Sequence, residues 1–189
     1  MTTKTDIRRH IHDQRQELTP NWVRPRSDRI QQRLLALDEW STARLICCYL
    51  AAPTEVQTGW IIDDCRQAGK QVWVPAFRPT RERYEWTRLA RADALTTGRH
   101  HIPEPEQPDW NRPGVVDIVI TPGLAFDSYG GRIGHGGGHY DRLLARAALR
   151  TALKVGLAFV FQIRDHVPTL AHDIGMDIIV TEYAVIRCR

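Results

Sequence analysis

The sequence predicts an α/β fold: a single three-layer α/β/α domain over residues 1–189, with a mixed, mainly parallel sheet. Short apolar runs rich in β-branched residues alternate with helical segments along the chain. Residues 45–74 have the strand, loop, helix, strand order of a parallel β-α-β unit. A chain of 189 residues can also build one hydrophobic core, which at this size removes roughly 70% of the unfolded surface from water.

A first helix is expected from Thr3 to Leu18, because Thr3 and Asp6 have capping-box spacing and a thin apolar stripe follows them. Lys4 and Arg8 are four residues apart and share a face, so they could grip one polyphosphate. The alternative is a solvated, charged helix surface. A second helix, from Thr19-Pro20 toward Leu37, is expected to serve packing only.

The remaining elements follow from apolar periodicity and from glycine and proline positions. We expect strands at 45–50, 72–74, 84–89, 115–120, 154–159 and 177–181, and helices at 58–68 and 139–149. Helical turns are expected at 91–95 and 162–166, and an irregular loop over the edge of the site at 96–113. Ligands of parallel sheets bind beyond the carboxyl ends of the strands, and Glu55 follows one such end. An acidic loop residue is also often plain surface.

The segment from Pro122 to Asp141 is the most unusual part of the chain. Six of the nine residues in 130–138 are glycine, and each ordered glycine costs roughly 0.5–1 kcal/mol relative to alanine. Glycines let successive amide groups face an anion, and the helix expected afterwards would add its positive dipole end. Strand, glycine loop and helix together indicate a phosphate site. The spacing fits neither a P-loop nor G-x-G-x-x-G, so a purely structural glycine-rich turn stays open.

The residues of this segment resemble the signature of the 5-formyltetrahydrofolate cyclo-ligase family, also called methenyltetrahydrofolate synthetase. The matching runs are Pro122-Gly-Leu-Ala-Phe-Asp127, Gly131-Arg-Ile-Gly134, Gly136-Gly-Gly138 and Tyr140-Asp-Arg142. The resemblance extends over nearly all of the chain through Lys4 with Arg8, Glu55 with Thr58, Glu104-Pro105, Gln162, His172-Asp173 and Thr181.

The resemblance implies an ATP-driven and Mg²⁺-dependent ring closure of 5-formyltetrahydrofolate to 5,10-methenyltetrahydrofolate, with release of ADP and phosphate. The formyl oxygen attacks the γ-phosphorus, N10 adds to the activated carbon, and phosphate leaves. Because no enzyme nucleophile is needed, catalysis should depend on positioning and on neutralising phosphoryl charge.

The resemblance also implies site residues. ATP contacts are expected from Lys4, Arg8, Arg132, Gly134, His135, Gly136, Gly137, Gly138, His139, Tyr140 and Asp141, and folate contacts from Leu50, Glu55, His135, His139 and Tyr140. The residues expected to act in catalysis are Glu55, Arg132 and Asp141, and those expected to hold Mg²⁺ are Asp141 and Asp173. A carboxylate such as Asp141 in the first turn of a helix is also simply favourable, by roughly 0.3–1 kcal/mol.

His135 and His139 depart from the family pattern, which commonly has a bulky or aromatic residue at the first position and Tyr or Phe at the second. An imidazole can stack on a pterin or bond a phosphate, and both positions border the folate pocket that the resemblance implies. Their spacing of four also occurs in helical zinc motifs, yet the glycines between them make a helix there unfavourable.

Composition limits the partners. The net charge is +4 and only Lys4, Lys70 and Lys154 among the 26 basic residues are lysine, which favours an anionic ligand. Nucleic acid is disfavoured because the basic residues are interleaved with 22 acidic ones. With no signal peptide and no 18-residue apolar run, we expect a cytoplasmic monomer that does not contact membranes.

The cysteines, Cys47, Cys48, Cys65 and Cys188, show no metal or disulfide spacing and are expected to be buried thiols. Two other interpretations of the whole chain stay open. One is an ATP-using ligase of the same fold that acts on another formyl or amide compound. The other is a basic binding module without catalysis.

Overall fold

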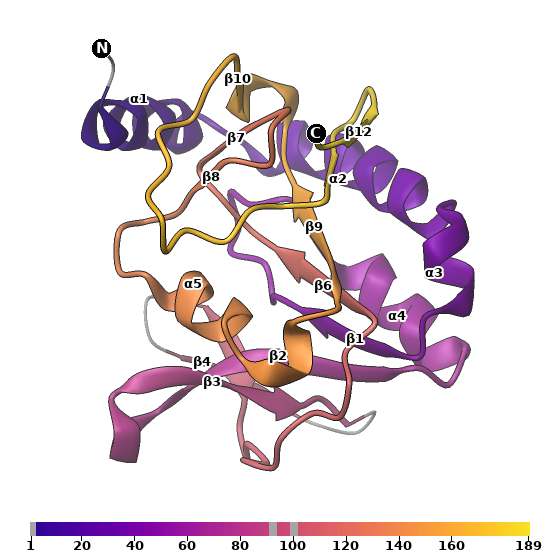
Figure 1. Cartoon of the computed structure of the whole chain (residues 1–189). Helices are drawn as coiled ribbons and strands as arrows, with labels where there is room; N and C mark the ends of the chain where they lie inside the picture. Colours follow the sequence, from indigo (N-terminus) through magenta and orange to yellow (C-terminus); the bar gives the residue numbers. More distant parts are fainter. Residues whose placement is uncertain (1–2, 91–93, 99–101) are drawn as a thin grey trace.

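The computed structural model describes residues 3–90, 94–98 and 102–189, and a seven-stranded sheet runs through its centre (Figure 1). In spatial order the strands are β12 (Val185–Arg187), β11 (Ile178–Val180), β9 (Leu153–Leu157), β6 (Ile118–Thr121), β1 (Leu45–Cys48), β2 (Gln71–Arg78) and β3 (Arg83–Arg88). The strands from β11 to β2 are parallel, whereas β12 and β3 pair antiparallel at the two edges. The mixed, mainly parallel α/β sheet predicted from the sequence is confirmed.

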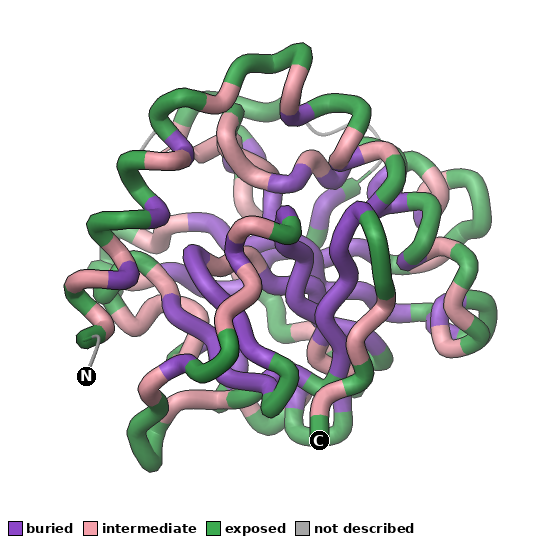
Figure 2. Tube along the Cα trace, turned by 90° about the horizontal axis from the view of Figure 1, so that it is seen from above, coloured by how far each residue is buried: buried purple, intermediate pink, exposed green. Residues whose placement is uncertain are grey.

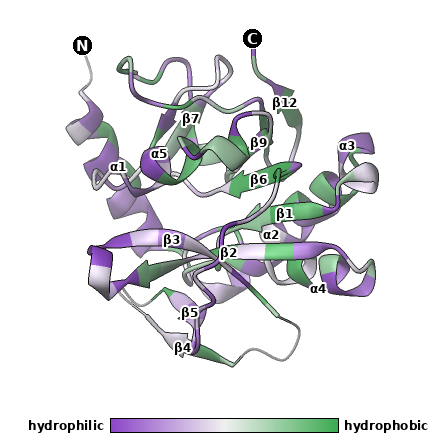
Figure 3. Cartoon of the chain, turned by 60° about the horizontal axis from the view of Figure 1, so that its bottom comes forward, coloured by the Kyte–Doolittle hydropathy of each residue, from purple (hydrophilic) through white to green (hydrophobic). Residues whose placement is uncertain are grey.

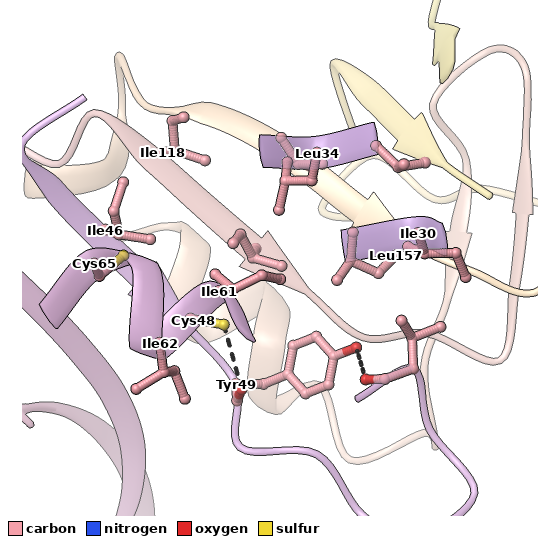
Figure 4. Packing of buried hydrophobic residues seen from close by; sticks show 14 of the residues in the cluster. Ile30, Leu34, Ile46, Cys48, Tyr49, Ile61, Ile62, Cys65, Ile118 and Leu157 are labelled. Carbon is pink, nitrogen blue, oxygen red and sulfur yellow. Dashed lines mark hydrogen bonds between the residues drawn. The ribbon is translucent and has the colours of Figure 1, made fainter. Parts of the chain in front are cut away.

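Helices cover one face of this sheet. They are α2 (Pro20–Leu35) and α4 (Gly59–Gln67), with the short α3 (Asp38–Thr42) between them in sequence. Figure 4 shows Ile30 of α2 beside Leu157 of β9 and Ile61 of α4 beside Cys48 of β1, all within one buried apolar cluster. Apolar packing of this kind is the main favourable contribution to folding.

The opposite face is covered by α5 (His139–Leu144) and by the 3₁₀ helix η3 (Ala147–Leu149). Leu143 and Leu149 pack there against Cys47 and Val119, whose neighbours in sequence point to the first face. Because both faces are buried, the central strands are continuous apolar runs rather than alternating ones. Figures 2 and 3 show these strands as the buried and hydrophobic centre of the molecule.

A small second sheet lies next to the first helix, α1 (Lys4–Gln16). Its strands are β10 (Ile163–Arg164), β7 (Ala125–Asp127) and β8 (Arg132–Ile133). Ile7 and Ile11 of α1 form an apolar cluster with Leu124, Ala125 and Ile133. The N-terminal helix is thereby fixed against the strands that flank the glycine-rich segment.

Several local predictions are confirmed. The capping box of Thr3 and Asp6 opens α1, and Gly69, with φ of +68°, follows the end of α4. The thiols of Cys47, Cys48 and Cys65 are buried, and burial raises the pKa of Cys65 to about 12. Cys188 is partly exposed, contrary to the prediction. No helix in the described ranges is long and apolar enough to cross a membrane.

The helix predicted over 139–149 is too long. The helix α5 ends at Leu144, and Arg146 has extended backbone angles, φ −68° and ψ 141°, which interrupt the helical path before η3. The side chain of Arg146 reaches back to Glu85 of β3, with 3.4 Å between Nη2 and Oε1. This tertiary contact accompanies the break that local helix propensity did not predict.

Other boundaries also differ from the predictions. The stretch expected as a loop contains β4 (Leu95–Thr97) and β5 (Pro103–Pro105), which pair antiparallel, and the strand expected at 115–120 begins at Ile118. The turn expected at 91–95 falls partly outside the described residues, and Leu95 belongs to β4. The turn expected at 162–166 is divided between η4 (Val160–Gln162) and β10, and β12 follows the strand expected to be last. The helix α3 and the 3₁₀ helix η1 (Pro79–Arg81) were not expected.

The junction of β2, β3 and the end of α5 contains a buried carboxylate, Glu85, surrounded by guanidinium groups. The ion-pair partners are Arg78 at 2.9 Å, Arg83 at 2.7 Å, and Arg81 and Arg146 at 3.4 Å. Burial alone would raise the pKa of Glu85, but hydrogen bonds from Arg78 and Arg83 outweigh it and lower the pKa to about 2. Glu85 therefore stabilises the fold as an anion.

Because the pKa of Glu85 is depressed in the folded state, its contribution is complete above pH 4.5 and is lost as the pH falls toward 2. We expect about 1–2 kcal/mol from this group, since the arginine partners are partly exposed to solvent. Urea unfolding of Glu85→Gln between pH 5 and pH 2 should show a shallower loss of stability than the wild type. Glu17→Gln, at an exposed position, is the matched control, and equal slopes in all three proteins would contradict the prediction.

Candidate active site

The N-terminal helix places its basic residues against the glycine loop, Gly134 to Gly138. Arg8 Nε donates a hydrogen bond of 2.9 Å to the carbonyl oxygen of Gly134. Lys4 Nζ lies 2.5 Å from Oδ2 of Asp173, in the connection between β10 and β11. The structure thus brings the glycine loop and Asp173 to Lys4 and Arg8 of α1, although more than 100 residues of sequence separate them from this helix.

The glycine loop exposes backbone donors. Within the described part of the chain, the amide groups of Gly134, Gly136, Gly137 and Gly138 donate no hydrogen bond. Gly136 has φ of +101° and Gly138 has φ of +62°, which other residues rarely adopt. Several amides without protein acceptors, next to a guanidinium group, form a suitable cradle for an anion.

The earlier glycines have a different role. Gly130, with φ of +87°, makes the turn between β7 and β8, where a Cβ atom would lie 2.5 Å from the Met176 carbonyl oxygen. The buried Asp127 accepts hydrogen bonds from the amides of Gly131 at 2.8 Å and Val167 at 2.6 Å. Part of the glycine content therefore maintains the fold, which agrees with the structural alternative for those positions.

Arg132 of β8 lies on the other side of the loop. Its side chain is 3% exposed, and Nη2 donates a hydrogen bond of 2.8 Å to Oδ1 of Asp141 in the first turn of α5. A Cβ atom on Gly134 would lie 3.2 Å from Nη1 of Arg132. The buried Nε has no hydrogen-bond partner among the described residues. An unsatisfied guanidinium donor in such a position suits an anionic ligand.

Glu55 follows β1 at the same edge of the sheet, and its side chain is 13% exposed. Oε2 accepts a hydrogen bond of 3.0 Å from the Ala52 amide, and Oε1 lies 3.5 Å from Nη2 of Arg15. Burial raises the pKa of Tyr140 well above its usual value, and the negative charge of Glu55 acts in the same direction. Glu55 therefore lies near the first turn of α5.

Tyr140 connects the two halves of the candidate site. The guanidinium carbon of Arg132 is 5.7 Å from the centre of its ring. The neighbouring Tyr49 is buried and donates a hydrogen bond of 2.6 Å to the Val56 carbonyl oxygen (Figure 4). Burial raises the pKa of Tyr49, and the negative charge of Glu55 acts in the same direction. Tyr140 also packs against the apolar cluster that contains Tyr49 and Val56.

A cavity of about 250 Å³ opens beside Leu50, which follows β1. Its apolar wall includes Ile62 of α4, Leu89, Leu95 and Pro103. The last two residues belong to the β4–β5 pair, and Pro103 lies in the segment 96–113, so this segment reaches the cavity beside Leu50. Leu50 is thus placed where an apolar part of a ligand could lie.

The two histidines have different surroundings. His139 Nδ1 lies 2.9 Å from Nη2 of Arg142, and its ring meets Tyr84 edge-on at 5.1 Å between centroids. Gly137 lies close to this ring, since a Cβ atom there would approach Nε2 to 2.6 Å. His135 is exposed on the glycine loop. Both stay predicted ligand contacts, with His139 held toward β3.

The predicted metal ligands are paired with different cations. Asp141 pairs with Arg132, and Asp173 pairs with Lys4. Burial alone would raise the pKa of Asp173, but the hydrogen bonds from Lys4 and the Leu170 amide lower it. The described residues contain no group of three or more His, Cys, Asp or Glu arranged to hold a metal. Magnesium needs only one or two protein carboxylates when phosphate oxygens and waters complete its shell, so Asp141 fits such a role.

Sequence reasoning missed Arg15. The residue is buried in α1, donates a hydrogen bond of 3.2 Å to Thr54 Oγ1 and pairs with Glu55. Its position seven residues after Arg8 on the same helical face was the available signal.

Comparison with known proteins identifies the family of the chain. A model of the 5-formyltetrahydrofolate cyclo-ligase family matches residues 1–182. The chain belongs to this family. It is therefore an enzyme of the cyclo-ligase class.

Individual cyclo-ligases are similar over nearly their full length. The 5-formyltetrahydrofolate cyclo-ligase of Saccharomyces cerevisiae is 30% identical over 203 residues, with 95% of each chain covered. The enzyme of that name from Escherichia coli K12 is 29% identical over 174 residues, which cover 90% of this chain and 96% of the relative.

Solved structures support the cyclo-ligase fold. The 5,10-methenyltetrahydrofolate synthetase of Aquifex aeolicus superposes with a TM-score of 0.83 at 31% identity, covering 98% of this chain and 93% of the other. The synthetase of Mycoplasma pneumoniae, with a TM-score of 0.73 and 21% identity, supports the fold alone.

Proposed function

We propose that this cyclo-ligase converts 5-formyltetrahydrofolate to 5,10-methenyltetrahydrofolate, with ATP hydrolysed to ADP and phosphate and with Mg²⁺ required. The observation that carries the ATP half is the glycine loop, where the amides of Gly134, Gly136, Gly137 and Gly138 donate no hydrogen bond within the described residues and the Arg8 and Arg132 guanidinium groups lie beside them. The folate half, which is the assignment of the folate substrate, depends on the names of the similar proteins.

In this proposal Lys4, Arg8 and Arg132 neutralise the phosphates, and the amides of the glycine loop orient them. The Arg132 guanidinium group is already held in place by Asp141, so little reorganisation of this cation is needed as charge develops on the transferred phosphoryl group. Asp141 would hold Mg²⁺, with Asp173 as a second contributor. The metal would lower the charge repulsion between the phosphates and the attacking oxygen.

Glu55, Leu50 and Tyr140 would bind the folate. The formyl oxygen attacks the γ-phosphorus and displaces ADP, which leaves a phosphorylated imidate at N5. N10 then adds to the activated carbon, its proton is removed, and phosphate leaves with the former formyl oxygen. Glu55 would accept the hydrogen bond of N10–H and take its proton, while Leu50 and the apolar wall beside it exclude water from the ring.

The test is substrate-dependent ATP hydrolysis. Adding 5-formyltetrahydrofolate and Mg²⁺ should release phosphate in step with the absorbance of the methenyl product. Hydrolysis stimulated by a different formyl or amide compound, and not by this folate, would favour a related ligase with another substrate. Nucleotide binding without any stimulated hydrolysis would favour a basic binding module. Cytoplasmic location and a monomeric state stay predictions, which fractionation and light scattering can check.

A further inference from the structure

One stripe of α1 spans the candidate site from end to end. Lys4, Arg8, Ile11 and Arg15 follow one another at intervals of four, three and four residues, so their side chains share one narrow face. At 1.5 Å per residue, this stripe is about 16 Å long. Lys4 meets Asp173, Arg8 meets Gly134, and Arg15 meets Glu55. A single helix beside β7 and β8 thus touches both proposed halves of the site (Figure 1).

Arg15 is the buried member of the stripe. Its side chain is 7% exposed, and a guanidinium group is costly to bury unless its charge is paired. Nη2 lies 3.2 Å from Thr54 Oγ1 and 3.5 Å from Oε1 of Glu55, two consecutive residues of the loop after β1. The buried positive charge of Arg15 is therefore paired with the negative charge of one carboxylate, that of Glu55.

The loop itself controls the other carboxylate oxygen. Oε2 of Glu55 accepts a hydrogen bond from the Ala52 amide, and the Glu55 amide donates to the Ala52 carbonyl oxygen, both at 3.0 Å. Gln57 Nε2 closes the loop through the carbonyl oxygens of Ala52 and Glu55. With Arg15 beside Oε1, the Glu55 carboxylate is held from both sides.

We propose that Arg15 is a positioning residue for the cyclisation step, acting through Glu55. This inference depends on the proposed function, because it assigns Arg15 to the step in which N10 attacks the activated formyl carbon. The guanidinium group fixes the orientation of the carboxylate that serves N10. The nucleotide is held by other residues, so Arg15 should affect product formation and not ATP affinity.

Arg15→Met keeps much of the volume and removes the charge. We expect the rate of methenyl product formation to fall about 10- to 100-fold, since a misplacement of about 1 Å can cost 100-fold. The KM for ATP should stay within about twofold, and more than one phosphate should be released per product. Arg15→Lys, which keeps a cation, should recover part of the lost rate. Arg9→Gln is the control on the exposed side of α1, and its rate and ratio should equal those of the wild type.

A double-mutant cycle with Glu55→Gln separates positioning from general stabilisation. If Arg15 acts through Glu55, adding Arg15→Met to Glu55→Gln should cause little further loss of rate. Losses that multiply in the double variant would overturn the proposal. So would a lower melting temperature combined with a wild-type rate and one phosphate per product. If Arg15→Met does not fold, Arg15→Lys enters the same cycle, judged by the same two outcomes.

The wild-type protein distinguishes this inference from the function on which it depends. If the wild type forms no methenyl product from 5-formyltetrahydrofolate, the proposed function fails. If the wild type forms the product and Arg15→Met has the same rate and ratio, the role of Arg15 fails alone.

Discussion

Replacing Asp141 with asparagine is expected to lower turnover by about 100- to 1000-fold while the protein stays folded. Asp141 anchors Arg132 through a contact of 2.8 Å, and Arg132 is the nearly buried cation beside Gly134. Asparagine keeps the shape of the side chain but removes the negative charge. The variant therefore loses the anion that orients Arg132 and the carboxylate proposed for Mg²⁺.

A magnesium titration shows which loss dominates. If Asp141 contributes to the metal site, the Mg²⁺ concentration for half-maximal turnover should rise in Asp141→Asn, and excess Mg²⁺ should recover part of the activity. Arg8→Ala is the comparison variant. It removes the α1 cation that lies beside the glycine loop, and it leaves Asp141 and Asp173, the two proposed metal ligands, in place. It should raise the KM for ATP without a comparable change in Mg²⁺ dependence. Wild-type turnover of Asp141→Asn at limiting Mg²⁺ would contradict the assignment.

The central sheet could be predicted because its strands are buried on both faces. Burial leaves continuous apolar runs, as in Leu45–Cys48 and Ile118–Thr121, and these need no knowledge of distant partners. The capping box of α1 is equally local, since Thr3 and Asp6 satisfy each other's backbone donors.

The surroundings of the glycine loop could not be predicted in the same way. The strands β7 and β8 have three and two residues, too few for any periodic pattern. Asp127, which precedes their turn, also accepts an amide hydrogen bond from Val167, which lies 40 residues away. At the early end of α5, the side chain of Arg146 likewise forms an ion pair with Glu85 of β3. In each case a tertiary contact that the local sequence does not reveal accompanies the local structure.

In the candidate site too, some features follow from the local sequence and others depend on distant partners. The glycine content and the spacing of Lys4 and Arg8 pointed to an anion site without any structure. The pattern could not show that the stripe continues to Arg15, since a basic helix face is indistinguishable from solvated surface until its partner is known. The partner, Glu55, lies 40 residues further along the chain. The role of Glu55 itself came from family resemblance and is still a proposal.

Replacing Glu55 with glutamine is expected to slow formation of the methenyl product by about 100-fold or more, a typical contribution of a general base. The nucleotide should bind almost as before, because the proposed phosphate contacts come from the glycine loop, α1 and Arg132 and not from the loop after β1. Glutamine keeps the size of the side chain and can still occupy the space between Arg15 and the Ala52 amide. What it loses is the ability to take the proton of N10.

In Glu55→Gln, phosphorylation of the formyl oxygen should then continue while the addition of N10 becomes slow. The formyl oxygen can still attack the γ-phosphorus, so the phosphorylated imidate forms, but N10 adds slowly and water can release phosphate instead. The decisive measurement is the ratio of phosphate released to methenyl product formed, with the product followed by its absorbance. We expect one phosphate per product in the wild type and several in Glu55→Gln. Glu106→Gln, an exposed glutamate replaced in the same way, should keep the ratio at one. If Glu55→Gln has both the wild-type rate and a ratio of one, Glu55 is a surface residue of the loop, and the proposed folate contacts are reduced to Leu50 and the residues around Tyr140.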